Sequence, residues 1–537
     1  MRKNLLFYFL ILFSLFSSYQ LYKTYPLWAL PSFDDDAARE VKKLQEVVAL
    51  TNAYYVDTLD WKKTITKGIE GMLSSMDPHS HYFSAEEGKA NDERFDARYQ
   101  GVGIEFDILD EKITVIAVIP GAPAQKAGLQ SGDRIVEIEG KNAVGLKRDE
   151  VPRLLKGPKG SSVKVGVERI GYDELLYFTI DRDEIPIFTI NTWFMANDTT
   201  GYVWVNRFAA TTTDELESAL VRLERKGMKQ LVLDLRGNGG GYLSEAVKMV
   251  AKFVNGHELV VYTRGRRDEN NREYFTDDYG PAHTRDIPLV VLINQASASA
   301  SEIVSGALQD YDRALITGEH SFGKGLVQNE FNLTDGARLR LTVSKYYTPS
   351  GRLIQRSYKD KSVKDYFKDA YDTTGAVYDS TGRPKFRTRM GRIVYGGGGI
   401  MPDHLQKLTT VSRYSEFTQK LLTKRIFFLF ATDYVYRHKS SLDDAERFYA
   451  AFRLNKAEWQ RFKRLVKKQG LSPDAGQLEK DRRFLENRIK AAIARNLWSE
   501  KGYWRVILEY DNQYDTALTL FPEYQELVKK RGTTHKN

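Results

Sequence analysis

The stretch Ile287 to Gln328 reads IPLVVLINQASASASEIVSGALQDYDRALITGEHSFGKGLVQ, and the rest of the chain is organised around it. It opens with a β-branched apolar run, Ile287 to Ile293, which predicts a buried strand. A cluster of small residues, Ala296 to Ser301, then precedes apolar residues at helical spacing, with Glu302 in the first turn. A second short strand leads to a lysine between two glycines, Lys324. This layout predicts a serine at a helix N-terminus and a lysine that returns toward it from a neighbouring strand end.

The serines of this stretch and Lys324 suggest nucleophilic chemistry. A serine hydroxyl is a poor nucleophile at neutral pH and needs a base. A lysine can be that base when burial disfavours its charge, and the flanking glycines leave room for close backbone approach. Ser299 is the candidate nucleophile, although composition alone makes Ser297 and Ser301 equal to it. Gln328 follows Lys324 at a spacing that shares one face of a helix or a strand, so it can orient the lysine in either case.

From these residues alone, a simpler interpretation stays open, in which the turn only packs a helix on a sheet and Lys324 is a solvated charge. The strings SASASEIVSGALQD and GEHSFGKGLVQ, however, closely resemble the active-site region of the C-terminal (tail-specific) processing proteases. The resemblance implies that Ser299 is the nucleophile, that Lys324 is the general base and that Gln328 assists the lysine. At these three positions the chain does not depart from the family.

A second motif, LVLDLRGNGGGYLSEAVKMVAKFV, predicts a strand, a glycine-rich turn and a helix. A dinucleotide site is excluded because Tyr242 stands where the third glycine should be, and no G-K-[ST] string is present for a P-loop. Glycine amides at a helix N-terminus can instead hold a developing negative charge. In the family this turn forms the oxyanion hole with the amide that follows the nucleophile. The candidates are Gly239 or Gly240, with Ala300, and the family usually has proline where this chain has Gly239.

A small β-rich module extends from about Ala97 to Glu184. Its string PGAPAQKAGLQSGDRIVEIEG closely resembles a PDZ domain. Such a domain binds a peptide as an added strand at a sheet edge and holds the terminal carboxylate on backbone amides. The resemblance implies that the peptide-binding residues are Gly101, Val102, Gly103, Ile104 and Phe106. A β-hairpin domain without a ligand is the simpler alternative.

The N-terminus has the form of an export signal, because Arg2 and Lys3 precede an apolar stretch from Leu5 to Phe16. Counted through Leu21, the stretch reaches about the length that crosses a bilayer, and no clean A-x-A cleavage site follows. We therefore expect an uncleaved anchor in the inner membrane, with the remaining chain exported to the periplasm. A cleaved signal is the alternative.

Composition narrows the class of protein. The 537 residues suffice for several domains, and 42% apolar with 28% charged residues is ordinary for a globular protein. The absence of cysteine excludes disulfides, thiol chemistry and zinc sites built on cysteine. The net charge of +9 is mixed along the chain, which favours a solvated surface near anionic lipid over nucleic-acid binding. We expect no metal and no cofactor.

The expected fold class is an α/β + β multidomain chain. An α/β peptidase core of the crotonase/ClpP type carries an inserted PDZ domain, an N-terminal helical segment and a C-terminal helical extension. The expected divisions are 1–24 (signal or membrane anchor), 25–96 (N-terminal helical region), 97–184 (PDZ domain), 185–410 (serine peptidase core) and 411–537 (helical extension). Polar residues from Lys359 to Arg392 predict an inserted loop or cap. For the extension, a dimerisation or docking platform and a helical cap on the core are equal alternatives.

These observations predict an exported serine endopeptidase with a Ser-Lys dyad. Its PDZ domain is expected to capture the free C-terminus of a protein or peptide substrate and deliver it to Ser299. A homo-oligomer is a further expectation. One alternative is a non-catalytic PDZ scaffold, which the presence of Ser299, Lys324 and Gln328 disfavours. Another is a hydrolase that pairs a serine with His320, the only histidine near the site motifs.

Overall fold

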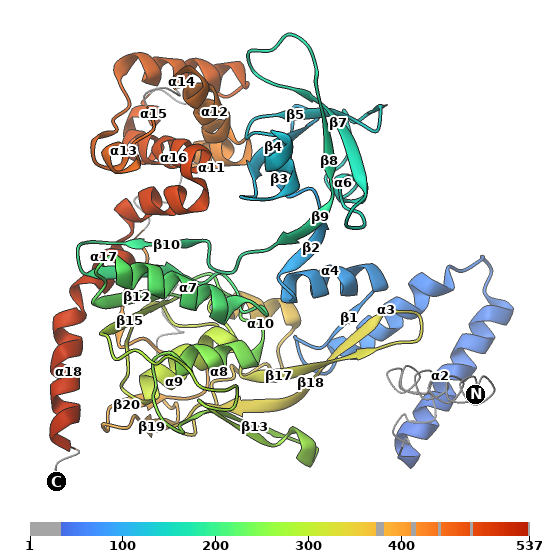
Figure 1. Cartoon of the computed structure of the whole chain (residues 1–537). Helices are drawn as coiled ribbons and strands as arrows, with labels where there is room; N and C mark the ends of the chain where they lie inside the picture. Colours follow the sequence, from blue (N-terminus) through green and yellow to red (C-terminus); the bar gives the residue numbers. More distant parts are fainter. Residues whose placement is uncertain (1–33, 372–380, 410–414, 439–441, 473–475, 535–537) are drawn as a thin grey trace, which may run out of the picture. The chain divides into compact units, whose positions relative to one another are not determined.

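The computed structural model describes residues 34–371, 381–409, 415–438, 442–472 and 476–534 (Figure 1). The predicted membrane anchor lies outside these residues. Within them, no helix combines the length and the apolar character that crossing a membrane requires. The chain divides into two compact units, Met1–Lys89 with Gln328–Thr342 and Ala90–Val327 with Val343–Asn537.

The first unit begins with two helices, α2 (Asp35–Tyr54) and α3 (Trp61–Ser74), as the helical periodicity predicts. Asp34 and Asp60 cap them by accepting hydrogen bonds from first-turn amides. Strand β1 (His81–Phe83) pairs antiparallel with the first residues of β18 (Arg338–Tyr347), which also pairs with β17 (Leu326–Asn332). Helix α4 (Ala85–Phe95) follows β1.

A six-stranded sheet forms the centre of the second unit, in the order β10-β11-β12-β15-β16-β21. Strands β11 to β21 pair in parallel, and β10 pairs antiparallel with β11. The strands are β10 (Thr192–Met195), β11 (Thr200–Trp204), β12 (Gln230–Asp234), β15 (Leu289–Ile293), β16 (Leu315–Gly318) and β21 (His404–Leu405). Every residue of β15 is buried, which confirms the predicted buried strand.

Helices cover both faces of this sheet. One face packs against α7 (Thr212–Arg225), α8 (Leu243–Ala251) and α9 (Ala300–Asp310). The other face packs against α17 (Asn512–Thr519) and α18 (Phe521–Thr534), the last helices of the chain, drawn in red in Figure 1. The end of the C-terminal extension therefore caps the core, which is one of the two roles left open by the sequence.

Smaller elements complete the core. Strand β13 (Leu259–Gly265) pairs with β14 (Arg272–Phe275) and with the last residues of β18, and β19 (Lys385–Arg387) pairs with β20 (Ile393–Tyr395). The polar segment predicted as an inserted loop or cap contains a helix, α10 (Val363–Ala370), before residues that are not described. Tyr366 and Ala370 share one face of α10 and are buried beside Phe322, which accounts for this helix in a polar segment.

The module predicted as a PDZ domain has a sheet in the order β3-β4-β5-β7-β8, with β3 at its edge among the described residues. The strands are β3 (Ile104–Leu109), β4 (Lys112–Val118), β5 (Arg134–Ile138), β7 (Ser162–Glu168) and β8 (Leu176–Asp181), and β6 (Lys141–Asn142) pairs with β5. Two short helices, α5 (Pro123–Ala127) and α6 (Val151–Leu155), pack on it. Strands β2 (Arg98–Gly101) and β9 (Asp183–Pro186) pair where the chain enters and leaves the module.

The extension begins with a helical bundle that has its own apolar core. Its helices are α11 (Glu416–Thr423), α12 (Ile426–His438), α13 (Ala445–Ala451), α14 (Lys456–Lys468), α15 (Gln477–Lys480) and α16 (Arg482–Ile507). Phe427 and Phe430 of α12 are buried in the core of the bundle, whereas Phe428 and Tyr434 are half-buried. Helix α16 is kinked at Trp498 and Ser499, where the backbone leaves helical geometry.

Candidate active site

Ser299 lies in a sharp turn between β15 and α9, directly before the first residue of the helix. Its backbone has φ 56° and ψ −115°, a conformation that residues with side chains rarely adopt. The surrounding structure must hold this strain, and such strain is concentrated at functional sites. Ser299 is half-buried, so its side chain is accessible.

The structure distinguishes Ser299 from Ser297 and Ser301, which the sequence alone left as equal candidates. The Ser297 hydroxyl is buried and donates to the Leu235 carbonyl at 2.8 Å. The Ser301 hydroxyl is buried and donates to the Asn238 carbonyl, also at 2.8 Å. Both hydroxyls fasten the nucleophile turn to the glycine-rich turn, which leaves Ser299 as the accessible hydroxyl of the three.

A buried carboxylate, Glu302, joins the turn that carries Ser299 to the loop that carries Lys324. One oxygen, Oε2, accepts the Ser299 amide at 2.9 Å and the Lys324 amide at 2.9 Å. The other, Oε1, accepts the Ser321 hydroxyl at 2.6 Å and the Gly323 amide at 2.7 Å. The backbone nitrogens of the candidate nucleophile and base are therefore bonded to one and the same oxygen atom.

The charge state of Glu302 is set by two opposing influences. Burial raises the pKa of the Glu302 carboxyl, since its charge has no water around it, and the four donated hydrogen bonds lower the pKa. The sequence suggested only that Glu302 would favour the helix N-terminus. Its bonds to the lysine loop depend on tertiary structure and could not be inferred from that position.

A tyrosine hydroxyl makes a second connection between the same two loops. Tyr346 is buried on β18, and its hydroxyl lies 3.1 Å from the Ser299 carbonyl oxygen and 2.7 Å from the Lys324 carbonyl oxygen. The amides of Ser299 and Lys324 thus meet at Glu302, and their carbonyls meet at Tyr346. Sequence reasoning missed Tyr346, although it belongs to the YYTPSG segment that resembles the family.

The glycine-rich turn lies against Ser299, between β12 and α8. A side chain on Gly240 (φ 97°) would lie 2.7 Å from the Ser299 Cβ and 3.0 Å from the Ala300 amide nitrogen. Glycine is therefore required there, and its missing side chain leaves space beside that amide. Gly239 has open space around it.

The amides proposed for the oxyanion hole differ in what they contact. The Gly240 amide donates to Asn238 Oδ1 at 2.9 Å, so Gly240 contributes space and its amide is engaged. In the described part of the chain, no hydrogen bond engages the amide of Ala300 or of Gly239. Their assignment as oxyanion donors stays a prediction, and the geometry favours Ala300 with Gly239.

Arg236 anchors this turn and was not identified from the sequence. Its guanidinium bonds to Asp234 Oδ2 at 2.6 Å and, in the C-terminal extension, to Asp511 Oδ2 at 2.7 Å and Gln513 Oε1 at 2.9 Å. Burial lowers the pKa of Arg236, whereas the adjacent carboxylates raise it. The effect of the carboxylates is larger, so the pKa of Arg236 is raised. The start of helix α17 therefore holds the turn that approaches Ser299.

His320 is not arranged as a general base for a serine. It is fully buried, its Nδ1 lies 3.1 Å from the Ser321 carbonyl oxygen, and its Nε2 lies 3.0 Å from Arg383 Nη1. Burial lowers the pKa of His320 to about 3. Since other groups engage both ring nitrogens, the alternative Ser-His pairing is disfavoured.

Gln328 donates from Nε2 to the His79 carbonyl oxygen at 3.0 Å. Its predicted role beside Lys324 stays a prediction. Lys324 itself is half-buried and follows Gly323, whose φ of 89° requires a residue without a side chain.

The predicted peptide-binding residues lie at the open edge of the PDZ sheet. Gly101 ends β2, Val102 is buried, and Gly103 has φ 81° just before β3. Ile104 and Phe106 pack from β3 against the apolar core of the domain. The arrangement provides an edge strand with an apolar face, which peptide addition requires, and the individual assignments stay predictions.

Three regions of the chain match known protein families. The family model for Peptidase family S41 matches residues 199–363, the PDZ domain model matches residues 114–169, and a family of unknown function (DUF8443) matches residues 417–499. The chain is 37% identical over 326 residues to the carboxy-terminal-processing protease of Bartonella bacilliformis, covering 60% of this chain and 74% of that protein. It is 32% identical over 341 residues to carboxy-terminal processing protease CtpB of Bacillus subtilis, covering 62% and 70%.

Solved structures are also similar in sequence. The photosystem II D1 C-terminal processing protease is 30% identical, with 58% of this chain and 83% of that chain covered and a TM-score of 0.34. The PDZ domain of the carboxy-terminal protease from Vibrio cholerae, solved in complex with a peptide, is 36% identical, with 16% and 97% covered and a TM-score of 0.16.

Proposed function

Because the chain belongs to the carboxy-terminal processing proteases, the PDZ-containing serine peptidases of Peptidase family S41, we propose that it is an exported endopeptidase with a Ser299–Lys324 dyad. The observation that carries the dyad is the shared oxygen of Glu302, to which the amides of Ser299 and Lys324 both donate at 2.9 Å. This contact holds together two loops that the chemistry requires side by side.

In this proposal, Ser299 Oγ attacks the scissile carbonyl carbon while neutral Lys324 takes the hydroxyl proton. The negative charge that develops on the carbonyl oxygen is held by the amide of Ala300, with Gly239 as the second donor. Lys324 then gives its proton to the departing amine, which leaves an acyl group on Ser299. A water molecule, deprotonated by the same lysine, then attacks the acyl carbon. The bond to Ser299 Oγ breaks, Lys324 returns the proton to Oγ, and the new C-terminus is released.

The substrates proposed are proteins or peptides with a free, apolar C-terminus. The PDZ domain would add the tail as a strand on β3 and hold its carboxylate on amides of the loop from Gly101 to Ile104. Ile104 and Phe106 supply the apolar surface beside this strand. Gln328 is proposed to orient Lys324.

Export to the periplasm and anchoring in the inner membrane belong to the same proposal, supported by the charged and apolar pattern of residues 1–24. We also propose a homo-oligomer that forms through α2. This helix buries no residue, and Leu44, Val47 and Leu50 are 62%, 54% and 59% exposed. Sedimentation of the soluble chain from Asp34 onward, with and without charged substitutions at these positions, tests the oligomer.

The dyad is tested with the soluble chain and its Ser299→Ala and Lys324→Ala variants. Cleavage of an unfolded protein with an apolar C-terminus should be lost in both variants, while circular dichroism and thermal stability stay as in the parent. Lys345→Ala is the matched control, since Lys345 is exposed on β18 and its loss should leave cleavage intact.

Each contrary outcome has a defined meaning. Retained cleavage by Lys324→Ala would refute the lysine-base mechanism. No cleavage by the parent would favour a non-catalytic PDZ scaffold. A chelator should leave cleavage unchanged, since no step uses a metal, and its loss on chelation would contradict the proposal.

A further inference from the structure

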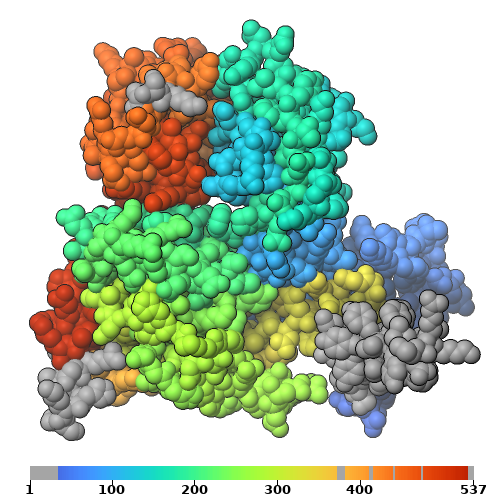
Figure 2. All heavy atoms as spheres, viewed as in Figure 1, coloured from blue at the N-terminus to red at the C-terminus, as the bar shows by residue number. Residues whose placement is uncertain are grey.

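The helical bundle of the extension packs against the PDZ domain (Figure 2). Side chains along a strand alternate between the two faces of its sheet. On β3, Ile104, Phe106 and Ile108 pack toward the core of the PDZ domain. Glu105 and Asp107 therefore point to the rear face, away from the surface beside which a bound peptide would lie.

Arginines of the bundle hold both of these rear carboxylates. Arg495 of α16 donates from Nη2 to Glu105 Oε2 at 2.8 Å. Arg425, just before α12, donates from Nε to Asp107 Oδ2 at 3.0 Å. Two different segments of the bundle thus form ion pairs with two alternate residues of β3, the edge strand that is predicted to receive the peptide.

A β-bulge adds an apolar contact to the same interface. The register between β3 and β4 shifts between Glu105 and Phe106, which leaves Ile116 of β4 without a paired residue. A bulge redirects side chains, and Ile116, which is only 4% exposed, lines a cavity together with Phe427 and Phe428 of the bundle. This isoleucine on the rear of the PDZ sheet therefore faces the bundle of the same chain.

Two glycines of the PDZ domain allow the close approach of the bundle. A side chain at Gly132 (φ 93°) would collide with Thr432 of α12, and one at Gly171 (φ 87°) would collide with Tyr436. Asn496 of α16 also donates to the Ser131 hydroxyl at 3.3 Å. The small residues of the PDZ domain thus match the side chains that the bundle places against them.

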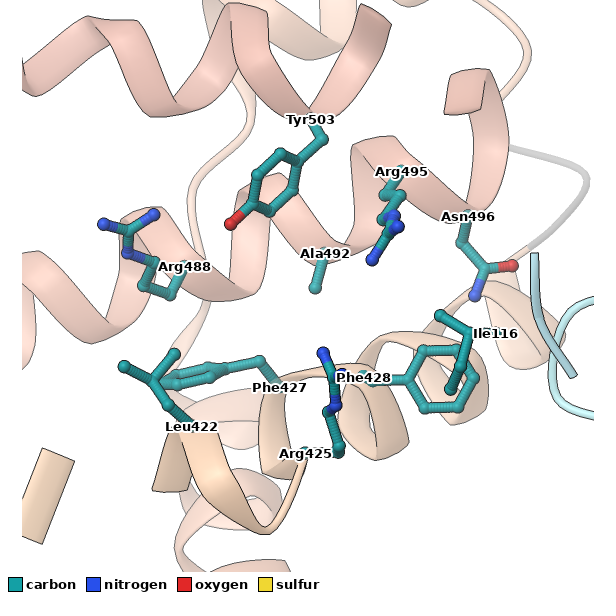
Figure 3. A pocket seen from close by; sticks show the side chains of 10 residues that line it. All are labelled: Ile116, Leu422, Arg425, Phe427, Phe428, Arg488, Ala492, Arg495, Asn496 and Tyr503. Atoms are coloured by element: carbon teal, nitrogen blue, oxygen red, sulfur yellow. The ribbon is translucent and has the colours of Figure 1, made fainter. Parts of the chain in front are cut away.

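The interface is not fully packed, however. Figure 3 shows Arg425 and Arg495 pointing from facing segments into a cavity of about 90 Å³, which Tyr503 also lines. Protein interiors normally leave few such voids. Ion pairs around a cavity favour a contact that can open and close, since polar groups released from it are readily solvated.

The other end of the extension is attached differently. Tyr514, Phe521 and Tyr524 are buried against the core sheet in a continuous apolar cluster. Helix α16 connects the two ends. Before its kink it carries Arg495, and after the kink Trp504 lies against Trp204 of β11 with ring centroids 4.6 Å apart.

We propose that the bundle is a latch for the PDZ domain, fixed to the core at one end and reversibly bound to Glu105 and Asp107 at the other. By holding β3 from behind, the latch sets the position of the peptide-binding strand relative to the core. This inference rests on the proposed function, and it assigns a role to the region that matches a family of unknown function.

The first test compares two forms of one unfolded substrate, one with a free apolar C-terminus and one with its C-terminus amidated. In Arg425→Glu and Arg495→Glu variants, kcat/KM for the free form should fall at least about 3-fold, while the amidated form is cleaved as by the parent. The exchanged pair Glu105→Arg with Arg495→Glu should recover most of the loss. Arg464→Glu, an exposed arginine of the same bundle, is the control.

The second test does not depend on cleavage. In a Ser299→Ala background, hydrogen exchange of residues 104–118 should be several-fold faster in the Arg425→Glu/Arg495→Glu double variant than in its parent. Unchanged exchange would overturn the latch, as would equal losses with both substrates or an exchanged pair that recovers nothing. If the parent cleaves neither substrate, the proposed function fails, and the exchange result still decides the latch.

Discussion

The turns that carry Ser299 and Lys324 and the proposed latch on the PDZ domain hold their key groups by contrasting means. At the turns, Glu302 is fully buried and accepts hydrogen bonds from backbone amides 3 and 22 positions away, those of Ser299 and Lys324. At the latch, Glu105 and Asp107 bind side chains 390 and 318 positions away, and the Glu105 side chain is 50% exposed. Buried backbone bonds fix a geometry that must not vary, whereas exposed ion pairs permit movement at little cost.

The largest effect is expected from Glu302→Gln, which disrupts the buried hydrogen bonds to the two turns. A glutamine side chain accepts hydrogen bonds at its oxygen only, and its nitrogen is a donor. Two of the four groups that donate to Glu302 would therefore face the amide nitrogen and lose their acceptor. We expect kcat to fall roughly 1,000-fold while KM changes little, because the substrate contacts remain and the relation of Ser299 to Lys324 is lost.

Glu245→Gln is the matched control for this substitution. Glu245 is also a buried carboxylate, and it accepts the Thr213 amide at 2.9 Å and the Thr213 hydroxyl at 2.6 Å, away from the catalytic turns. It should reduce thermal stability and leave kcat nearly unchanged. Equal losses of kcat in the two variants would show that Glu302 has only a general structural role.

A smaller effect is expected from Gly240→Ala, which fills the space beside the nucleophile. The added methyl group would meet the Ser299 Cβ and the Ala300 amide, and φ 97° strains any residue with a side chain. We expect kcat to fall roughly 100-fold, comparable to the loss of an oxyanion donor. Gly237→Ala, in the same turn, carries a similar backbone strain (φ 74°) but has open space around it, so it isolates the effect of the steric contact. It should cost much less kcat than Gly240→Ala, and similar losses would contradict the assignment.

The next effect is on stability and concerns His320. Burial lowers its pKa to about 3, so below pH 6.5 the unfolded chain binds a proton that the folded chain does not. The folded state therefore loses no stability through His320 above pH 6.5. As the pH falls from 6.5 toward 3, the free energy of unfolding decreases because the unfolded chain takes up this proton. Between pH 6.5 and pH 5 this decrease amounts to about 2 kcal/mol.

A His320→Gln variant should therefore show a weaker dependence of unfolding free energy on pH than the parent across this window, measured by denaturant titration. Its cleavage activity at pH 7.5 should be retained. Loss of activity in a folded variant would revive the Ser-His alternative.

The smallest effect is expected from salt, and it acts on the exposed side of the contrast. Raising the salt concentration from 0.1 M to 1 M shortens the screening length from about 10 Å to about 3 Å. Cleavage of the substrate with a free C-terminus should fall about 2-fold relative to the amidated one, which tests whether the PDZ domain is held by ion pairs. An identical response of both substrates would contradict this.

The local elements and their order could be predicted from the sequence, because they depend on periodicity, glycine positions and short-range spacing. The buried β15, helix α9 at Ser299, the glycine turn and the edge strand β3 were all readable in this way. The motifs also predicted the family.

Three features required the folded structure: which of the three serines is accessible, which atom joins the loops of Ser299 and Lys324, and what the extension contacts. Ser297, Ser299 and Ser301 are the same residue type, so the sequence does not distinguish them. Their burial differs because Ser297 and Ser301 face the glycine turn. The partners of Arg236, Glu105 and Asp107 come from distant segments. Such pairs leave no periodic signal along the chain, since they arise only when packing brings the segments together.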